Sequence, residues 1–387
     1  MAEVDGTCDD RFEAVRQVLA GALDAGDDLG ASVAVTMGAE PVVDLWGGWA
    51  DEARQTPWQE DTVTNVWSTT KTMTSLAALL LVERGELDVY APVARYWPEF
   101  AANRKEGVEV RHLMSHTSGV SGWAQPVQME DIFDWERSTS MLAAQPPWWE
   151  PGTASGYHAL NQGHLVGEVI RRITGTPLRT FFAEEIAGPL GADFQIGLDP
   201  ADRGRVSNVV PPPPLAFDLE AIGADSVAVK TLTGPLADAS VAWSEGWRAA
   251  DIGAANGHGN ARSVARIQSV VANGGEVDGV RLLSPETIEL IFDEQSDGVD
   301  LVIGIPLRFG IGYALPQTAT LPYIPDGKIC FWGGWGGSMV VVDVERRLTI
   351  AYMMNKMQAG IIGNTTAGSL ITAVYSALGV AGPVAAI

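Results

Sequence analysis

Cysteine is scarce in this sequence. Two cysteines occur among 387 residues, and they lie far apart in the chain, at Cys8 and Cys330. Neither forms a C-x-x-C pair or a cluster with histidine, which argues against a structural metal site. The five histidines also lack the H-E-x-x-H spacing of helical zinc sites. We therefore expect no metal site.

Basic residues are few as well. Lys and Arg total 25 against 48 Asp and Glu, which gives a formal net charge of −23. No block of Lys or Arg forms the positive patch that binds phosphate groups, so we expect no nucleic-acid partner. A surface this acidic also repels anionic ligands, although only weakly at physiological salt.

Long apolar runs are missing too. No segment reaches the length of a membrane-spanning helix, so we expect no membrane association. The N-terminal residues, MAEVDGTCDDRFEAVRQVL, are acidic and lack the basic and apolar regions of a secretory signal. The sequence therefore predicts a cytoplasmic protein, and it gives no indication of the oligomeric state.

The residues that are present suit a large globular core. Hydrophobic residues make up 46% of the chain, enough for one composite domain or two. Residues 10–26 have the spacing of an amphipathic helix, and the next segments, ASVAVTMG and PVVDLWGGWA, are typical of strands. Near the other end, FGIGYAL, MVVVDVE and RLTIAYMMN also predict strands, and AGSLITAVYSALG predicts a last helix.

This order of elements predicts an α+β fold. The two ends of the chain, residues 1–84 and 240–387, are expected to form one antiparallel sheet flanked by terminal helices. A mostly helical lobe, residues 85–239, is inserted between them. A cleft between two such lobes is a usual place for an active site.

One segment combines a buried helix with reactive side chains. Residues 65–85, NVWSTTKTMTSLAALLLVERG, predict an apolar helix that ends at Gly85. Ser68 and Lys71, near its start, share one helix face. A lysine in apolar surroundings can lose its charge and remove the proton of a serine hydroxyl, and the free N–H groups of a first helical turn favour negative charge. The same pattern also fits a capping serine and a lysine that reaches solvent.

Other arrangements for nucleophilic catalysis or phosphate binding are missing. The sequence has no G-x-S-x-G motif, which argues against an α/β-hydrolase nucleophile elbow. No glycine-rich loop follows a P-loop or dinucleotide-binding pattern, and the segment GGWGG lacks the lysine and the helix that such a loop needs.

Further motifs follow Ser68 and Lys71 along the chain. They are LMSHTSGVSGW (113–123), PPWWEPGTASGYHALNQGHLVGEVIRRITG (146–175), LLSPETIELI (282–291), FGIGYAL (309–315) and FWGGWGGSMVVVD (331–343). In this order and spacing the sequence resembles the serine β-lactamase and penicillin-binding-protein superfamily, in particular the class C-like branch and its esterase relatives, the family VIII carboxylesterases. The resemblance covers nearly the whole chain and implies the β-lactamase/transpeptidase-like fold.

The resemblance also implies three motifs that line one cleft. The first is Ser68 with Lys71. The second, usually Tyr-x-Asn, corresponds to Tyr157-His158-Ala159. The third, Lys-Thr-Gly in β-lactamases and often His- or Trp-Gly-Gly in esterases, corresponds to Trp332-Gly333-Gly334. The family's oxyanion hole uses the backbone N–H of the nucleophile and of the residue after the third motif, here Ser68 and Trp335.

These correspondences define the candidate site. Ser68 is expected to be the nucleophile, and Lys71 and Tyr157 the proton-transfer pair; the sequence does not assign which of the two is the base at each step. This chemistry needs no metal and no cofactor, so we expect none. The residues expected to contact substrate are Trp332, Gly333, Gly334, Trp123 and His158. Packing in the core is the competing reading for Trp123, and a surface or packing role for His158.

Two departures from the family pattern bear on the substrate. Ala159 replaces the asparagine that in β-lactamases helps to hold the substrate's side-chain amide. Trp332 replaces the lysine that helps to hold the carboxylate of penicillins. Both losses favour a serine carboxylesterase acting on neutral esters. The bulk of Trp332 and Trp335 near the oxyanion hole favours short acyl groups. A β-lactamase or D-alanyl-D-alanine peptidase, an acyltransferase, and a non-catalytic binding protein on the same fold remain as alternatives.

Overall fold

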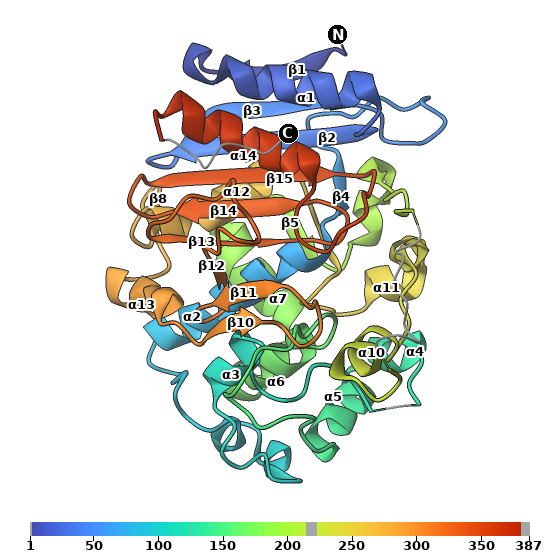
Figure 1. Ribbon diagram of the computed structural model, residues 1–387, viewed down its shortest axis with the longest axis vertical. Helices are drawn as coiled ribbons and strands as arrows, with labels where there is room; N and C mark the ends of the chain where they lie inside the picture. Colours follow the sequence, from blue (N-terminus) through green and yellow to red (C-terminus); the bar gives the residue numbers. More distant parts are fainter. Residues whose placement is uncertain (1, 125, 214–222, 381–387) are drawn as a thin grey trace.

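The computed structural model describes residues 2–124, 126–213 and 223–380. Within these ranges nine strands form one antiparallel sheet (Figure 1). In order across the sheet they are β1 (Val4–Cys8), β3 (Glu40–Gly48), β2 (Gly30–Met37), β15 (Leu348–Met354), β14 (Met339–Asp343), β13 (Ile329–Gly333), β12 (Ala314–Leu315), β11 (Pro306–Phe309) and β10 (Ser296–Val299). Strands from the two ends of the chain thus meet where β2 pairs with β15.

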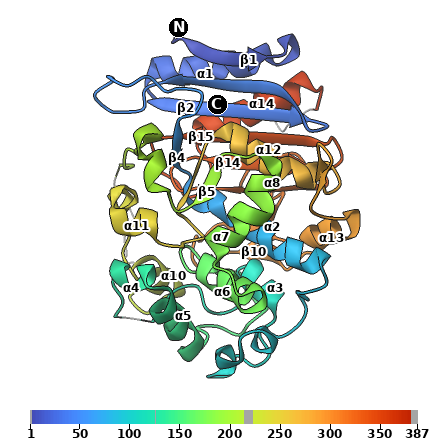
Figure 2. The ribbon, with the colours of Figure 1, turned by 180° about the vertical axis from the view of Figure 1, so that it is seen from behind.

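Helices cover both faces of this sheet. The terminal helices α1 (Glu13–Ala25) and α14 (Thr365–Ala377) pack against each other on one face, and α12 (Ala261–Ala272) packs on the opposite face, against β2, β14 and β15 (Figures 1 and 2). Every residue of β14 and β15 is buried, which explains why these strands, apart from Asp343 and Thr349, are apolar throughout instead of alternating. The predicted α+β class, with an antiparallel sheet flanked by terminal helices, is confirmed.

Two strand details differ from the prediction. The five-residue edge strand β1 was not predicted, because its sequence, VDGTC, has no apolar alternation. The predicted strand FGIGYAL is also interrupted: β11 ends at Phe309 and β12 begins at Ala314. Gly310 lies so close to another segment that a Cβ atom there would stand 1.9 Å from the Ile291 carbonyl oxygen. A close backbone approach therefore breaks this strand.

The middle of the described chain is mainly helical. Its elements are β4 (Val63–Asn65), α2 (Thr70–Glu83), α3 (Val110–Met114), α4 (Met129–Phe133), α5 (Trp135–Ala144), α6 (Gln162–Thr174), α7 (Leu178–Phe182), α8 (Gly188–Leu190), β5 (Phe194–Ile196), β6 (Val206–Ser207), α10 (Val227–Leu232), α11 (Glu245–Ala249), β7 (Gly257–Gly259), β8 (Glu276–Val277), β9 (Val280–Arg281) and α13 (Pro285–Glu289). Four of these strands form a small sheet in the order β5-β7-β4-β6, and β8 and β9 form a hairpin. The division into lobes at residues 85 and 240 stays a prediction.

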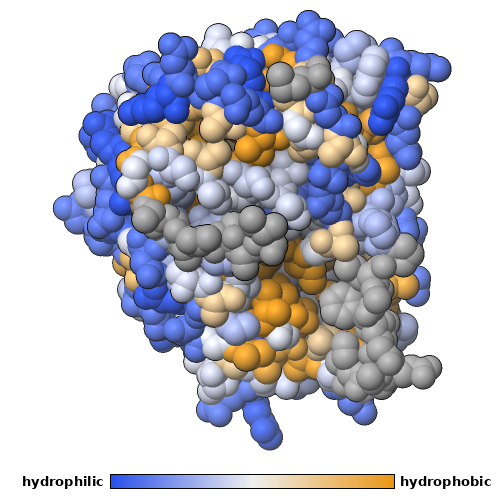
Figure 3. All heavy atoms as spheres, turned by 45° about the horizontal axis from the view of Figure 1, so that its top comes forward, coloured by the Kyte–Doolittle hydropathy of each residue, from blue (hydrophilic) through white to orange (hydrophobic). Residues whose placement is uncertain are grey.

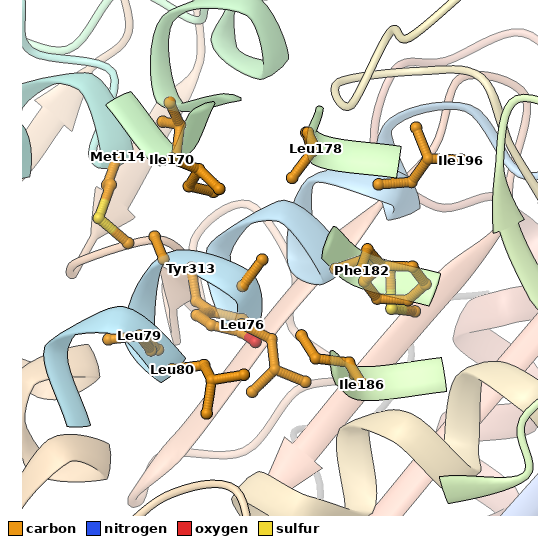
Figure 4. Packing of buried hydrophobic residues seen from close by; sticks show 14 of the residues in the cluster. Leu76, Leu79, Leu80, Met114, Ile170, Leu178, Phe182, Ile186, Ile196 and Tyr313 are labelled. Carbon is orange, nitrogen blue, oxygen red and sulfur yellow. The ribbon is translucent and has the colours of Figure 1, made fainter. Parts of the chain in front are cut away.

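Helix α2 runs through the middle of one large apolar core. Its residues from Thr70 to Leu81 are all buried, so the helix is enclosed on every side, and Met73 and residues 76–81 belong to the apolar core. Figure 4 shows Leu76, Leu79 and Leu80 of α2 among side chains from several other segments; these include Met114, Ile170, Leu178, Phe182, Ile186, Ile196 and Tyr313. Gly85, at a φ of 72°, follows the helix end as the sequence predicts.

The molecular surface is mostly hydrophilic on the face seen in Figure 3, and apolar side chains gather most visibly in the lower middle of the view. This agrees with the large excess of acidic residues. No helix in the described part of the chain is both long enough and apolar enough to cross a bilayer.

Candidate active site

Ser68 lies in a tight turn immediately before α2. A single 3-10 turn, Trp67–Thr69, precedes the helix, which begins at Thr70. Trp67 has a φ of 49°, an uncommon conformation for a bulky residue. Its ring lies between those of Trp247 and Trp335, with centroid distances of 5.5 and 5.1 Å. This packing holds a turn in which Ser68 keeps 9% of its surface exposed.

Lys71 is fully enclosed and faces Ser68. Its Nζ atom lies 3.0 Å from Ser68 Oγ and donates to the carbonyl oxygens of Ala159, at 2.7 Å, and Ala254, at 2.9 Å. Burial lowers the pKa of Lys71 well below the usual lysine value. A neutral amine has two hydrogens and one lone pair. When the amine is neutral and the two carbonyls accept both hydrogens, its lone pair is left to accept the proton of the Ser68 hydroxyl; when it is charged, it donates to Ser68 Oγ.

Tyr157 completes a group of three side chains. It comes from the irregular segment between α5 and α6, and it is buried. Its phenol oxygen accepts a hydrogen bond of 3.2 Å from Trp332 Nε1 and is also hydrogen-bonded to Ser68. Lys71 Nζ lies 4.7 Å from the centre of the tyrosine ring. Burial raises the pKa of Tyr157, against the opposing effect of these hydrogen bonds, so its phenol is neutral near pH 7.

The turn between β13 and β14 is attached to the turn that holds Ser68. Gly334 N donates to Ser338 O at 2.8 Å, which closes the turn. The Ser338 hydroxyl donates to Val66 O at 2.8 Å and lies 3.0 Å from Thr69 Oγ1. The segment that follows Trp332 is therefore fixed beside the start of α2.

The backbone N–H groups expected to form the oxyanion hole lie at this junction. Those of Ser68 and Trp335 donate to no acceptor among the described residues. Unpaired N–H groups at a helix start, next to a hydroxyl group, suit the binding of developing negative charge. The arrangement has the parts that acyl transfer needs: a hydroxyl, an adjacent amine, a phenol and two N–H donors.

A model of the beta-lactamase family matches residues 15–367. The chain belongs to this family. It is 35% identical over 376 residues to the esterase/beta-lactamase LipL of Mycobacterium tuberculosis, covering 94% of this chain and 86% of that protein. It is 29% identical over 358 residues to the esterase EstB of Burkholderia gladioli, covering 85% of this chain and 86% of EstB.

Solved structures give the same family. A family VIII carboxylesterase superposes with a TM-score of 0.91 at 39% sequence identity, covering 97% of this chain and all of that one. A penicillin-binding-protein homologue from Caulobacter crescentus superposes with a TM-score of 0.90 at 35% identity, with the same coverage. The resemblance inferred from the sequence motifs is confirmed.

The structure of this beta-lactamase family member brings only some of the expected substrate-binding residues together. Trp332 and Gly334 lie beside Tyr157 and Ser68, and Gly333 is the last residue of β13. Trp123 does not join them. It is 1% exposed, and its indole N–H donates to Ser138 Oγ, 3.0 Å away in α5. For Trp123 the competing reading, a core tryptophan, agrees with the structure.

His158 is the second expected substrate-binding residue that the structure places elsewhere. It is completely buried, with Nδ1 2.7 Å from Gly156 O and Nε2 2.6 Å from Ser118 Oγ. Burial lowers the pKa of His158 to about 3, so the ring is neutral; Nδ1–H donates to the carbonyl, and Nε2 accepts from the hydroxyl. Both ring nitrogens are engaged within the protein. His158 therefore holds the tyrosine segment in place, and its side chain is closed to a substrate.

The backbone groups around Lys71 were not foreseen from the sequence. Ala254 contributes a carbonyl oxygen 183 positions away in the chain, and alanine carries no side chain that signals a role. Asp300 accepts a hydrogen bond from Tyr157 N at 3.1 Å, again from a distant segment. An isolated acidic residue in a loop gives no sequence signal, so only the fold reveals it.

Gly334→Ala should disrupt the junction between the two turns. A Cβ atom at this position would stand 2.3 Å from both Val66 O and Ser338 Oγ, so the Trp335 segment would move away from Ser68. We expect kcat for a 4-nitrophenyl ester to fall by about 10²-fold, as on loss of an oxyanion donor. Gly21→Ala is the matched control, because a Cβ atom there contacts nothing within 4 Å. Unchanged kcat in the Gly334 variant would contradict this role of the junction.

Proposed function

We propose that the protein is a serine carboxylesterase that hydrolyses small neutral esters through an acyl-enzyme at Ser68. The observation that carries the proposal is the setting of Lys71: its amine is buried, lies 3.0 Å from Ser68 Oγ, and is held there by hydrogen bonds to the carbonyl oxygens of Ala159 and Ala254. The relatives LipL and EstB are named esterases, and the family VIII carboxylesterase is the same fold at 39% identity, which supports the assignment.

In the proposed first half-reaction, the acyl group passes from the alcohol of the substrate to Ser68, and the serine proton passes in the end to the alcohol. Ser68 Oγ attacks the carbonyl carbon while its proton passes to Lys71 Nζ. The N–H groups of Ser68 and Trp335 bind the oxyanion. Collapse of the tetrahedral intermediate expels the alcohol oxygen, which takes the proton of the Tyr157 hydroxyl, and Lys71 returns its extra proton to the phenolate.

The second half-reaction repeats these steps with water. Water loses a proton to the neutral Lys71 and attacks the acyl carbon. Ser68 Oγ leaves and is reprotonated through Tyr157, which releases the carboxylic acid and restores the starting state. Burial lowers the pKa of Lys71 and raises the pKa of Tyr157, so it favours the neutral form of both groups. A neutral amine can accept a proton and a neutral phenol can donate one, so we assign Lys71 as the base and Tyr157 as the acid.

The dependence of activity on pH should follow the protonation of the Lys71 amine. The base works only when it is neutral, so kcat/KM should fall as the pH drops through the lowered pKa of Lys71. The raised pKa of Tyr157 keeps the phenol protonated, so no loss is expected on the alkaline side up to about pH 9. The measurement is kcat/KM for 4-nitrophenyl acetate from pH 5 to 9, in buffers of constant ionic strength. A rate that does not vary over this range, with chemistry rate-limiting, would count against a lysine base.

Substrate choice is proposed from Trp332. Its indole stands where the β-lactamases of the family have a lysine, and an indole offers no charge to a substrate carboxylate, which is costly to bury unpaired. The net charge of −23 adds a weaker, salt-sensitive repulsion of anions. Trp335, packed against Trp67, adds bulk beside the proposed oxyanion site and should limit the acyl group to short chains.

A chain-length series tests this proposal. We expect kcat/KM to be highest for 4-nitrophenyl acetate or butyrate and to fall for octanoate and palmitate. Nitrocefin, an anionic cephalosporin, should be turned over far more slowly than the acetate ester in the same buffer. A preference for octanoate or longer would contradict the short acyl site. Nitrocefin turnover equal to that of the acetate would favour a β-lactamase instead.

The cytoplasmic location and the absence of a nucleic-acid partner stay predictions from the sequence. The roles of Ser68, Lys71, Tyr157 and Trp335 belong to the proposal and depend on the experiments described here.

A further inference from the structure

The position of Tyr157 depends on contacts with other parts of the chain. It belongs to no helix or strand, so the regular backbone hydrogen bonds of a secondary structure do not fix it. Its ring contacts His116 edge-on, with a centroid distance of 5.0 Å, and its phenol oxygen accepts from Trp332. Its backbone N–H is held by a side chain from a distant loop, that of Asp300.

Asp300 organises the loop that joins β10 to β11. It follows β10 directly and is 1% exposed. Its Oδ1 atom accepts three backbone N–H groups: that of Tyr157 at 3.1 Å, and those of Val302 and Ile303 at 2.9 Å each. In addition, Leu301 N donates to Ser155 O at 2.8 Å, two residues before the tyrosine. The loop and the tyrosine segment therefore share one buried carboxylate oxygen.

A carboxylate in this place is costly. Asp300 forms no salt bridge with a described residue, and its Oδ2 atom has no hydrogen-bond partner among them. A buried charge without a counter-ion destabilises a fold unless hydrogen bonds compensate, and here they converge on Oδ1 alone. The charge of Asp300 also raises the pKa of Tyr157, in the direction that keeps the phenol protonated. The position of this group beside the candidate acid suggests that its role is functional.

We infer that Asp300 is a positioning residue for Tyr157: by accepting the Tyr157 N–H together with those of Val302 and Ile303, it sets the phenol at the distance from Ser68 and Lys71 that proton transfer requires. The inference rests on the proposed esterase function. It assigns a part in the reaction to a loop that none of the three sequence motifs includes. Displacing a reacting group by about 1 Å can cost about 10²-fold in rate, so the effect is measurable.

Asp300→Asn and Asp300→Ala separate the roles of the acceptor and of the fold. Asparagine keeps an acceptor oxygen at Oδ1 and puts its NH2 group in the position of the unpaired Oδ2. Alanine removes the acceptor. We expect Asp300→Ala to lower kcat for 4-nitrophenyl acetate by about 10- to 100-fold with little change in KM, and Asp300→Asn to restore most of the loss. If the alanine variant does not fold, Asp300→Glu, whose carboxylate lies one methylene further out, replaces it with the same expected loss.

Asp343→Ala is the matched control. Asp343 is also a buried aspartate, bonded to Arg346, but it lies at the end of β14 away from the Ser68 junction. Its loss should lower the melting temperature and leave kcat of the folded protein unchanged. Wild-type kcat in a folded Asp300→Ala or Asp300→Glu variant would overturn the inference, as would an asparagine variant as slow as the alanine one.

A second readout keeps this test separate from that of the proposed function. A fluorophosphonate labels Ser68 with loss of fluoride, which needs no proton from Tyr157. Asp300→Ala should therefore be labelled at nearly the rate of the wild type and of Asp300→Asn, although its kcat is lowered. An Asp300→Ala variant whose labelling rate fell as far as its kcat would show that the substitution disturbs Ser68 or Lys71 and not Tyr157, and would overturn the role of Asp300. A wild-type protein that is neither labelled nor active would instead contradict the proposed esterase.

Discussion

Ser68→Ala should lower kcat/KM for 4-nitrophenyl acetate by about 10³-fold or more. The hydroxyl lies 3.0 Å from the Lys71 amine at the start of α2, and no other group in the proposal can form the acyl-enzyme. Ser68 is only slightly exposed, and its loss leaves the surrounding core intact, so circular dichroism and the melting temperature should stay close to those of the wild type. The measurement is steady-state kinetics on protein purified away from host esterases.

Ser75→Ala provides a matched control for this variant. Ser75 lies on the same helix and donates to Gly312 O at 2.9 Å, so its loss removes a buried hydrogen bond at a cost of about 1 kcal/mol. It should change stability slightly and leave kcat unaltered. If Ser68→Ala kept more than a few per cent of the wild-type activity, Ser68 would not be the nucleophile.

Lys71→Met should reduce kcat by about 10²- to 10⁴-fold, the range expected for loss of a general base. Methionine is close to lysine in length and fits the apolar surroundings, but it cannot accept the serine proton. The carbonyl oxygens of Ala159 and Ala254 lose their donor, so a lower melting temperature is expected together with the loss of activity.

Lys105→Met shows which part of that effect is structural. Lys105 is also completely buried, and its amine donates to three carbonyl oxygens, those of Ala102, Ala143 and Gln145. It has no contact with Ser68. The Lys105 variant should be destabilised and yet retain the kcat of the folded enzyme. A Lys71 variant that kept its activity while losing stability would show that Lys71 only supports the fold.

The fold could be predicted where side chains repeat with a clear period or form long apolar runs. The apolar segments that became β14, β15 and α2 were recognised, because continuous burial leaves a continuous apolar sequence. Strands of two or three residues, such as β6 and β7, are too short to show a period. The break between β11 and β12 depends on contact between Gly310 and the distant Ile291, which no local pattern records.

The candidate site shows the same limit. The spacing of Ser68 and Lys71 predicts their contact, because helix geometry alone brings i and i+3 together. The motifs placed Tyr157 and Trp332 in one site. The structure brings Tyr157 to Ser68 and Lys71, and Trp332 to Tyr157. The acceptors that hold Lys71 and Tyr157 are two alanine carbonyls and Asp300, groups whose role depends on the fold and not on residue type. His158 stood inside a motif but packs inward, since its neighbour Tyr157 takes the position facing Ser68.

Trapping the acyl-enzyme tests the central claim most directly. Wild-type protein mixed with excess 4-nitrophenyl acetate and quenched in acid within milliseconds to seconds should carry one acetyl group by intact mass. Peptide mapping should place that group on Ser68, and it should disappear as the substrate is consumed. An acetyl group on another residue, or turnover of the ester by a folded enzyme that never carries one under rapid quench, would contradict a Ser68 acyl-enzyme.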